Sequence, residues 1–271
     1  MKSDFGYPSW KEEHKSILKN LVGKNIKMLF SGGKDSSVVM YFISKAAKEF
    51  GFDFTAHTGA LPVSRYTDTE KKRIESYWIK RRVNITWYDI AKTDDHLRSS
   101  ENPCLICQME RKKLLKDILT SSTEDWENLV IIVCFSLWDI VSYALEQLLG
   151  DILSDSEQQI GIESNKRFKE TAQRFYPIIK MKEGYTVFRP LIKYNNDDIY
   201  KIIAQEGIPL ISIPCEFKDL RPKRILEKYY EKMGLRFNYN QLLAFAKQSL
   251  NLPDISSYSA IAKEDYFLDI F

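Results

Sequence analysis

The fold is decided by the stretch Leu29-Phe30-Ser31-Gly32-Gly33-Lys34-Asp35-Ser36-Ser37. An apolar run over 26–30, interrupted by one lysine, stops at the two glycines, and an apolar-periodic segment over 38–50 follows them. This order predicts a buried strand that leads into a helix. The glycines allow close backbone approach, and hydroxyls, Lys34 and the free amides of a helix start suit phosphate. The spacing is neither that of Walker A nor that of the dinucleotide fingerprint. A plain helix cap is the alternative explanation of Asp35 and the serines.

Strand and helix patterns alternate beyond this stretch. After a leading helix over 9–22, the patterns predict strands at 53–58, 84–88 and 129–135, and helices at 68–82, 111–119 and 139–149. A hairpin of 176–180 with 186–188 and helices at 196–206, 221–233 and 239–250 follow. The alternation predicts an α/β fold with a doubly wound parallel sheet that binds ligands at the carboxyl ends of its strands.

We expect three parts in the chain. Residues 1–22 form an N-terminal helix, 23–212 an α/β domain with a polar excursion at 150–174, and 213–271 a small helical C-terminal extension.

Composition narrows the class of protein. The chain of 271 residues is 44% hydrophobic and 28% charged, which is typical of a globular protein, and its net charge of +3 permits a nucleic-acid partner without requiring one. It lacks an apolar leader pattern and a long apolar run, so we expect a soluble, cytoplasmic protein without a membrane partner. Four cysteines do not form a disulfide scaffold in a chain of this length.

Three cysteines have a pattern suited to metal binding. Cys104 and Cys107 form a C-x-x-C pair, and Cys215 follows Pro214 in an expected loop. Three thiolates leave one position open, as in an iron–sulfur cluster that binds an outside ligand. A structural zinc site completed by Cys134 or a histidine and plain small hydrophobic residues are alternatives. A thioredoxin-like redox pair fits less well, because the preceding Asn-Pro lacks the matching βαβ context.

The first stretch resembles a known loop. Ser31–Ser36 is similar to the S-G-G-x-D-S loop of the ATP pyrophosphatases, which split ATP into AMP and pyrophosphate to activate a substrate oxygen as an adenylate. Between about 25 and 220 the chain resembles the tRNA 2-thiocytidine synthetase family within that superfamily. The resemblance is carried by three further segments: Pro103–Cys107 followed by Arg111, Phe188–Leu191 followed by 197–199, and Ile213–Cys215.

The resemblance implies a cofactor set and a reaction. Cys104, Cys107 and Cys215 would hold a [4Fe-4S] cluster whose open iron carries sulfur to the activated base. The phosphates of ATP, with Mg²⁺, would bind the loop, whose residues are Ser31, Gly32, Gly33, Lys34, Asp35, Ser36 and Ser37. We expect Lys34 to counter the charge of the leaving pyrophosphate, Asp35 to orient the metal or the loop, and Asp139 to contact a second metal or the substrate.

The partners follow from the same resemblance. They would be a tRNA or another nucleobase-containing substrate and a sulfur donor such as sulfide or a persulfide carrier. The sequence itself gives no oligomeric state, and a homodimer is one option for this chain. Basic stretches at 111–113 and 221–228 could contact RNA phosphates, although charged helix faces are usually only solvated.

The chain departs from the family in one segment that bears on function. Cys134–Asp139 keeps only the last acid of a G-H-H-x-D-D-type pattern, and Lys218 stands where some relatives have a further cysteine. Two other functions therefore stay open: an ATP-dependent amide ligase of the diphthamide type without a cluster, and a non-catalytic protein that binds ATP or a cluster. A free nucleobase or another small molecule is an alternative sulfur acceptor.

Overall fold

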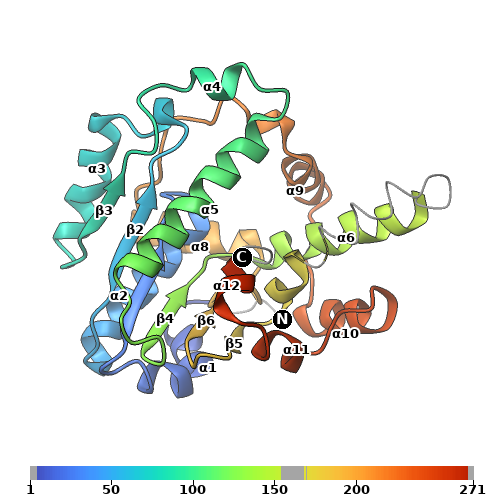
Figure 1. The fold of residues 1–271 in the computed structure, drawn as a ribbon, viewed down its shortest axis with the longest axis horizontal. Helices are drawn as coiled ribbons and strands as arrows, with labels where there is room; N and C mark the ends of the chain where they lie inside the picture. Colours follow the sequence, from blue (N-terminus) through green and yellow to red (C-terminus); the bar gives the residue numbers. More distant parts are fainter. Residues whose placement is uncertain (1–4, 154–167, 169, 268–271) are drawn as a thin grey trace.

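The computed structural model describes residues 5–153, 168 and 170–267, and its centre is a six-stranded sheet (Figure 1). The strand order is β3-β2-β1-β4-β6-β5, in which β5 alone pairs antiparallel. The strands are β1 (Asn25–Leu29), β2 (Thr55–Gly59), β3 (Ile85–Tyr88), β4 (Leu129–Ile132), β5 (Ile178–Lys180) and β6 (Thr186–Phe188). The doubly wound, mainly parallel α/β sheet is thereby confirmed.

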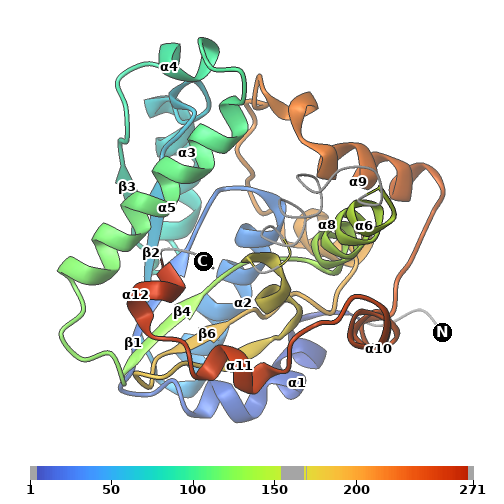
Figure 2. The same cartoon turned by 45° about the vertical axis from the view of Figure 1, so that its right-hand side comes forward.

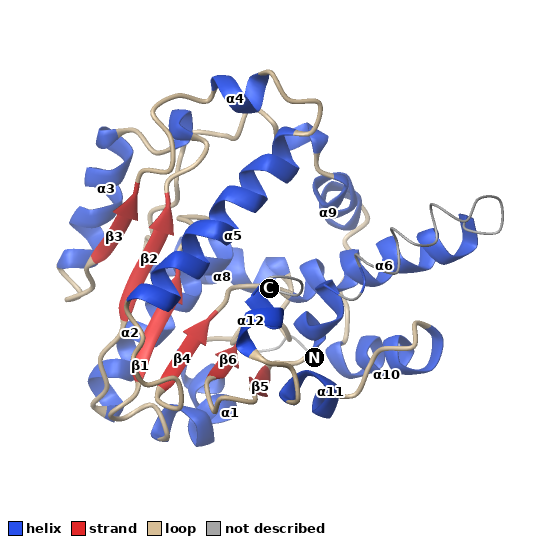
Figure 3. Cartoon of the chain, viewed as in Figure 1, coloured by secondary structure: helices blue, strands red, loops and turns tan. Residues whose placement is uncertain are grey.

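The chain reverses direction across the sheet between β1 and β4. It runs from β1 to β2 and β3 on one side, then crosses to β4 and β6 on the other. Such a switch point is where doubly wound sheets bind ligands, outside the carboxyl ends of the strands. In Figure 3 the arrowheads of the parallel strands point toward α4 and α9, so these helices lie at the carboxyl-terminal edge.

Helices cover both faces of the sheet. One apolar cluster joins the sheet to α1 (Tyr7–Lys19), α2 (Lys34–Phe50), α3 (Asp68–Ile79) and α8 (Asn196–Glu206). The other cluster joins it to α5 (Pro103–Ser121), α6 (Leu137–Leu153), α10 (Tyr239–Ser249) and α11 (Ile255–Ser259), and Figure 2 shows α11 and α12 (Lys263–Asp265) on the side of α5. All four residues of β4 are buried, as expected for a central strand with helices on both sides.

The remaining elements are short or lie at the carboxyl-terminal edge. They are α4 (Asp95–Arg98), α9 (Pro222–Lys232) and the 3-10 turns η1 (Val63–Arg65), η3 (Gln173–Phe175) and η4 (Lys218–Leu220). The segment after 213 is tied to α8, where Arg236 donates to Asp198 at 2.8 Å and the amide of Phe237 donates to Asn195 at 2.9 Å. Its division from the α/β domain at 213 stays a prediction.

Most expected elements are present, although the bounds of several differ by a few residues. Two of the differences concern cysteines. The helix expected at 111–119 begins at Pro103, because the side chain of Asn102 caps it by accepting from the amide of Leu105. This start places Cys104 and Cys107 in the first turns of α5. The strand expected at 129–135 ends at Ile132, so Cys134 lies beyond it. Most of the excursion expected at 150–174 lies outside the described residues. No helix in the described part of the chain could span a membrane.

Candidate active site

The phosphate loop, Ser31–Ser37, lies between the end of β1 and the start of α2. Gly32 has a φ of +66°, a conformation that L side chains rarely adopt, and Gly33 is extended at the N-cap of α2. The Ser36 hydroxyl donates to the carbonyl of Gly33 at 3.1 Å and accepts from the amide of Ser31 at 3.2 Å. These bonds hold the loop in shape, with the positive end of the α2 dipole at the switch point of the sheet.

The lysine of the loop is paired with its neighbour. Lys34 Nζ lies 2.8 Å from both carboxylate oxygens of Asp35, and the two side chains are only 9% and 17% exposed. The positive charge of Lys34 is therefore balanced inside the loop. An anionic ligand would have to attract Lys34 away from Asp35 or bring a cation for the carboxylate.

A second loop, Ile208–Phe217, carries Cys215 and is fastened to the phosphate loop. The amide of Ile211 donates to the carbonyl of Gly32 at 2.9 Å. The carboxylate of Glu70 in α3 accepts from the amide of Ser212 at 2.9 Å and from its hydroxyl at 2.8 Å. A hydrogen bond from Arg73 lowers the pKa of Glu70 to about 2, so Glu70 is ionised at neutral pH. The Cys215 loop is thus held from two sides.

The three cysteines of the expected metal site lie in one neighbourhood. Cys104 Sγ lies 3.6 Å from the carbonyl oxygen of Phe217, two residues after Cys215. Burial raises the pKa of the Cys107 thiol, Arg111 and Arg221 act in the opposite direction, and the other two thiols raise it further. Such mutual effects require the thiols to lie close together. Within the described residues, however, no three Cys, His, Asp or Glu side chains are arranged to hold a metal ion.

Cys134 and Asp139 occupy the segment that follows β4. Cys134 Sγ lies 3.5 Å from the carbonyl of Leu29, and burial, with a contribution from Asp35, raises the pKa of this thiol well above its usual value. Asp139 is 1% exposed and accepts from the amide of Ser136 at 2.6 Å and from its hydroxyl at 2.9 Å. Its other oxygen forms an ion pair with Lys223 of α9. The catalytic role expected for Asp139 stays a prediction.

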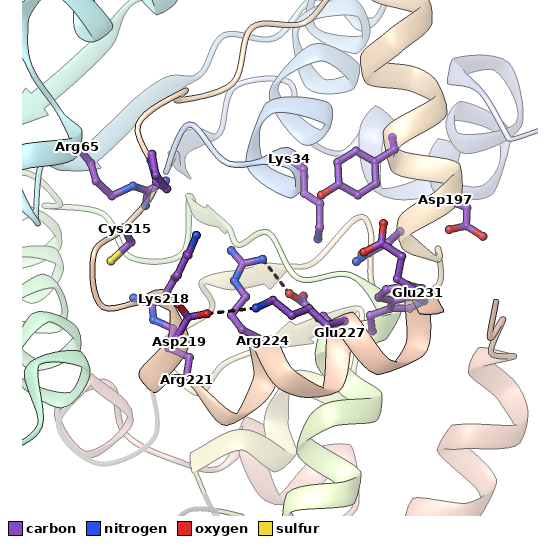
Figure 4. Close-up of a pocket in the computed structure, with 15 residues that line it drawn as sticks. Lys34, Arg65, Asp197, Cys215, Lys218, Asp219, Arg221, Arg224, Glu227 and Glu231 are labelled. Atoms are coloured by element: carbon purple, nitrogen blue, oxygen red, sulfur yellow. Dashed lines mark hydrogen bonds and ion pairs between the residues drawn. The ribbon is translucent and has the colours of Figure 1, made fainter. Parts of the chain in front are cut away.

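A cavity of about 270 Å³ lies beside the phosphate loop and the Cys215 loop (Figure 4). It lies between the start of α2, the Cys215 loop and α9, and both Lys34 and Cys215 line it. Its remaining lining residues are mostly charged or polar: Arg65, Trp138, Asn196, Asp197, Tyr200, Pro214, Lys218, Asp219, Arg221, Arg224, Glu227, Lys228 and Glu231. Some of these charges are paired with one another, as Figure 4 shows for Arg224 with Glu227 at 2.8 Å. The walls are suited to a polar, anionic ligand.

Several supporting residues could not be found from the sequence. The Tyr66 hydroxyl donates to the carbonyl of Ser31 at 3.0 Å and accepts from Arg111 at 2.8 Å. Arg111 also donates to the carbonyl of Gly59 at 3.0 Å, so this arginine braces the loops where the basic pattern had suggested contact with RNA. Neither Tyr66 nor Glu70 belongs to a recognisable pattern, because their partners lie far away in the chain.

Comparison with known proteins gives structural matches alone. No family model matches the chain, and no curated protein does. The U34-tRNA thiolase NcsA from Methanococcus maripaludis, solved with its [4Fe-4S] cluster, matches 91% of this chain and 82% of its own with a TM-score of 0.61 and 16% identity.

Two synthetases match less closely. The NH3-dependent NAD synthetase from Campylobacter jejuni has a TM-score of 0.45 and 12% identity, covering 94% of each chain. The NAD+ synthetase from Burkholderia pseudomallei has a TM-score of 0.48 and 15% identity, covering 92% of this chain and 91% of its own. Because both TM-scores are below 0.5, we draw no argument from these two structures. The likeness to the thiolase extends over most of both chains, and it agrees with the α/β fold expected for a divergent pyrophosphate-loop protein.

Proposed function

We propose that the protein is an ATP-dependent sulfurtransferase. It would adenylate an oxygen atom of a nucleobase in tRNA and replace that oxygen with sulfur. The proposal rests on one observation above all: a single cavity is lined by Lys34 of the phosphate loop and by Cys215 of the cysteine group. The hydrogen bond between Ile211 and Gly32 ties the two loops together. An activated group bound at the phosphate loop would therefore lie beside the thiols.

The residues of the phosphate loop would carry the first half-reaction. The amides at the start of α2 would bind the ATP phosphates, and Asp35 would hold the Mg²⁺ that accompanies ATP after Lys34 turns to the phosphates. The substrate oxygen attacks the α-phosphorus and the bond to pyrophosphate breaks. Lys34 would stabilise the charge that grows on this leaving group.

The second half-reaction is an exchange at the activated carbon. Sulfide from an outside donor attacks this carbon, and the original oxygen leaves with AMP. Cys104, Cys107 and Cys215 would hold a [4Fe-4S] cluster, which supplies an iron site for the sulfur. The donor set suits such a cluster because all three ligands are thiols. Burial raises the pKa of the Cys107 thiol, so cluster binding would have to remove its proton. The thiols are not at ligand positions in this structure, so the cysteine segments must close on the cluster.

The first test is the iron content and visible spectrum of anaerobically purified protein. Wild type is expected to contain iron and sulfide and to be coloured, whereas Cys104→Ser loses both. Cys134→Ser is the matched control, because Cys134 is a thiol of the same chain outside the group of three. Equal iron content in Cys104→Ser and wild type would contradict the ligand assignment.

The second test measures the reaction. Protein reconstituted with iron and sulfide, given ATP and labelled sulfide, is expected to release pyrophosphate and to label tRNA. Free nucleosides in a parallel reaction decide between tRNA and a small acceptor. Absence of labelling with a complete tRNA pool and with nucleosides would refute the sulfurtransferase. The homodimer and the cytoplasmic location stay predictions.

A second candidate is the cluster-free ATP-dependent amide ligase. One observation favours it: within the described residues, the three thiols are not arranged as ligands of a metal ion. Such an enzyme would use the same phosphate loop to activate a carboxylate, which ammonia or an amine then attacks. Colourless protein that releases pyrophosphate only with a carboxylate and ammonia would support the ligase over the sulfurtransferase.

A further inference from the structure

Lys223 connects the C-terminal extension to the start of α6. It stands in the first turn of α9, and its Nζ forms an ion pair with the carboxylate of Asp139. Glu227, one turn later, lies 3.8 Å from the same nitrogen. Asp139 is 1% exposed, whereas the Lys223 side chain is 30% exposed. The ammonium group is therefore held at the boundary between the protein interior and solvent.

The charges of the phosphate loop act on this lysine. Burial lowers the pKa of Lys223 to about 8; Glu227 and Asp35 raise it, while Lys34 and Arg224 lower it. Distances tie Lys223 to its charged neighbours, because Glu227 lies 3.8 Å from Lys223 and 2.8 Å from Arg224. Lys34, Arg224 and Glu227 all line the cavity. Lys223 itself does not line the cavity, but its partner Glu227 does, so Lys223 lies next to the cavity wall.

We propose that Lys223 is a second lysine that binds the phosphates of ATP, and that Asp139 holds it in place until ATP arrives. The inference rests on the proposed use of ATP. Lys34 is already balanced by Asp35, and the terminal phosphates of ATP carry more charge than one lysine can neutralise. A lysine has a flexible stem and a compact charge, so its ammonium can move from a carboxylate to a phosphate without moving the helix.

The proposal gives the extension and Asp139 a shared role. At the carboxyl-terminal edge of the sheet, α9 would complete the phosphate site. The buried carboxylate of Asp139 would set the resting position of the Lys223 ammonium group. Because Lys223 would contact the terminal phosphates, its contribution should be large for ATP and small for AMP.

The test is ATP and AMP binding by calorimetry to the full chain. Lys223→Gln is expected to weaken ATP binding about tenfold or more, as expected for a lost charge-assisted hydrogen bond, and AMP binding less than about twofold. Lys232→Gln is the matched control, because Lys232 is exposed at the end of the same helix and does not line the cavity. It should leave both affinities unchanged.

Two further variants keep the test decisive if Lys223→Gln folds poorly. Lys223→Gln combined with Asp139→Asn leaves no unpaired buried charge and should still lose ATP affinity, whereas Lys223→Arg should retain most of it. If wild type binds ATP and Lys223→Gln or the double variant binds it equally well, the role of Lys223 is wrong and the proposed function still stands. Absence of ATP binding by wild type would overturn both this role and the proposed function.

Discussion

The contact between Gly32 and Ile211 makes a sharp prediction, because it joins the phosphate loop to the Cys215 loop. A β-carbon at Gly32 would lie 2.4 Å from Cγ1 of Ile211 and 3.2 Å from its Cδ1. It would also have to adopt a φ of +66°. We therefore expect Gly32→Ala to be destabilising for two separate reasons, backbone strain and a side-chain clash.

The size of each effect follows from general magnitudes. The left-handed conformation costs a residue with a side chain about 1–2 kcal/mol. Forcing an extra carbon against a buried side chain costs about 1–3 kcal/mol, and Ile211 is only 9% exposed. The free energy of unfolding should therefore fall by about 2–5 kcal/mol in Gly32→Ala.

Gly23→Ala is the control for backbone strain. Gly23 has a φ of +75°, and a β-carbon there would meet nothing within 4 Å. Its substitution should cost only the strain, about 1–2 kcal/mol.

A double-mutant cycle separates the clash from the strain. Ile211→Ala removes Cγ1 and Cδ1 but keeps its β-carbon, which lies 3.6 Å from the added carbon, an ordinary contact. In the Ile211→Ala background the cost of Gly32→Ala should fall to about that of Gly23→Ala, giving a coupling energy of about 1–3 kcal/mol by urea unfolding. Equal costs of Gly32→Ala in both backgrounds would refute the contact between the two loops.

Three other groups give predictions of their own. Glu70→Gln should lower the free energy of unfolding by about 1.5–3 kcal/mol through weaker bonds to Ser212, and alkylation of Cys215 should become faster. Because the pKa of Glu70 is lowered to about 2, this contribution to wild-type stability should be present above pH 4.5 and fade toward pH 2 in acid titrations. An identical acid profile in the variant would argue against it. Because burial lowers the pKa of Lys223 to about 8 and the lysine must be charged to bind phosphate, calorimetric ATP affinity should decline above pH 8 relative to pH 7, whereas Lys223→Arg should show no decline. The raised pKa of Cys134 should make its thiol slow to alkylate at pH 8 in the folded protein, as read by mass spectrometry, and labelling as fast as in urea would contradict the raised pKa.

The parts of the fold that the sequence predicts are those with local causes. The loop after β1, the hairpin of β5 with β6 and the helix that ends at Gly207 each follow from periodicity, glycine or a cap within a few residues. The sequence pattern predicts a start of α5 that is too late. The structure shows the reason: the Asn102 side chain accepts from the amide of Leu105 and so caps a helix that begins at Pro103.

Local motifs predict the candidate site residues, whereas the residues that support them have no local pattern. Motif spacing singled out Lys34, Asp35 and the three cysteines, since these residue types are needed together for phosphate and thiolate chemistry. The brace from Glu70 to Ser212 spans 142 positions, and no local pattern could reveal it. A basic run likewise looks the same whether its lysines face solvent or, like Lys223, reach a buried carboxylate.

The position of α9 makes the roles of Asp139 and Lys223 depend on each other. Asp139 is the one residue of its segment that matches the pattern the sequence resembles, and its buried carboxylate is paired with Lys223. Removing the acid would leave Lys223 without its resting partner, and removing the lysine would leave a buried charge, which is costly. On this view Asp139→Asn should change ATP affinity through the position of Lys223, so the effect should disappear in the Lys223→Gln background. Calorimetry of the double-mutant cycle measures this, and additive losses would show that Asp139 acts on ATP independently of Lys223.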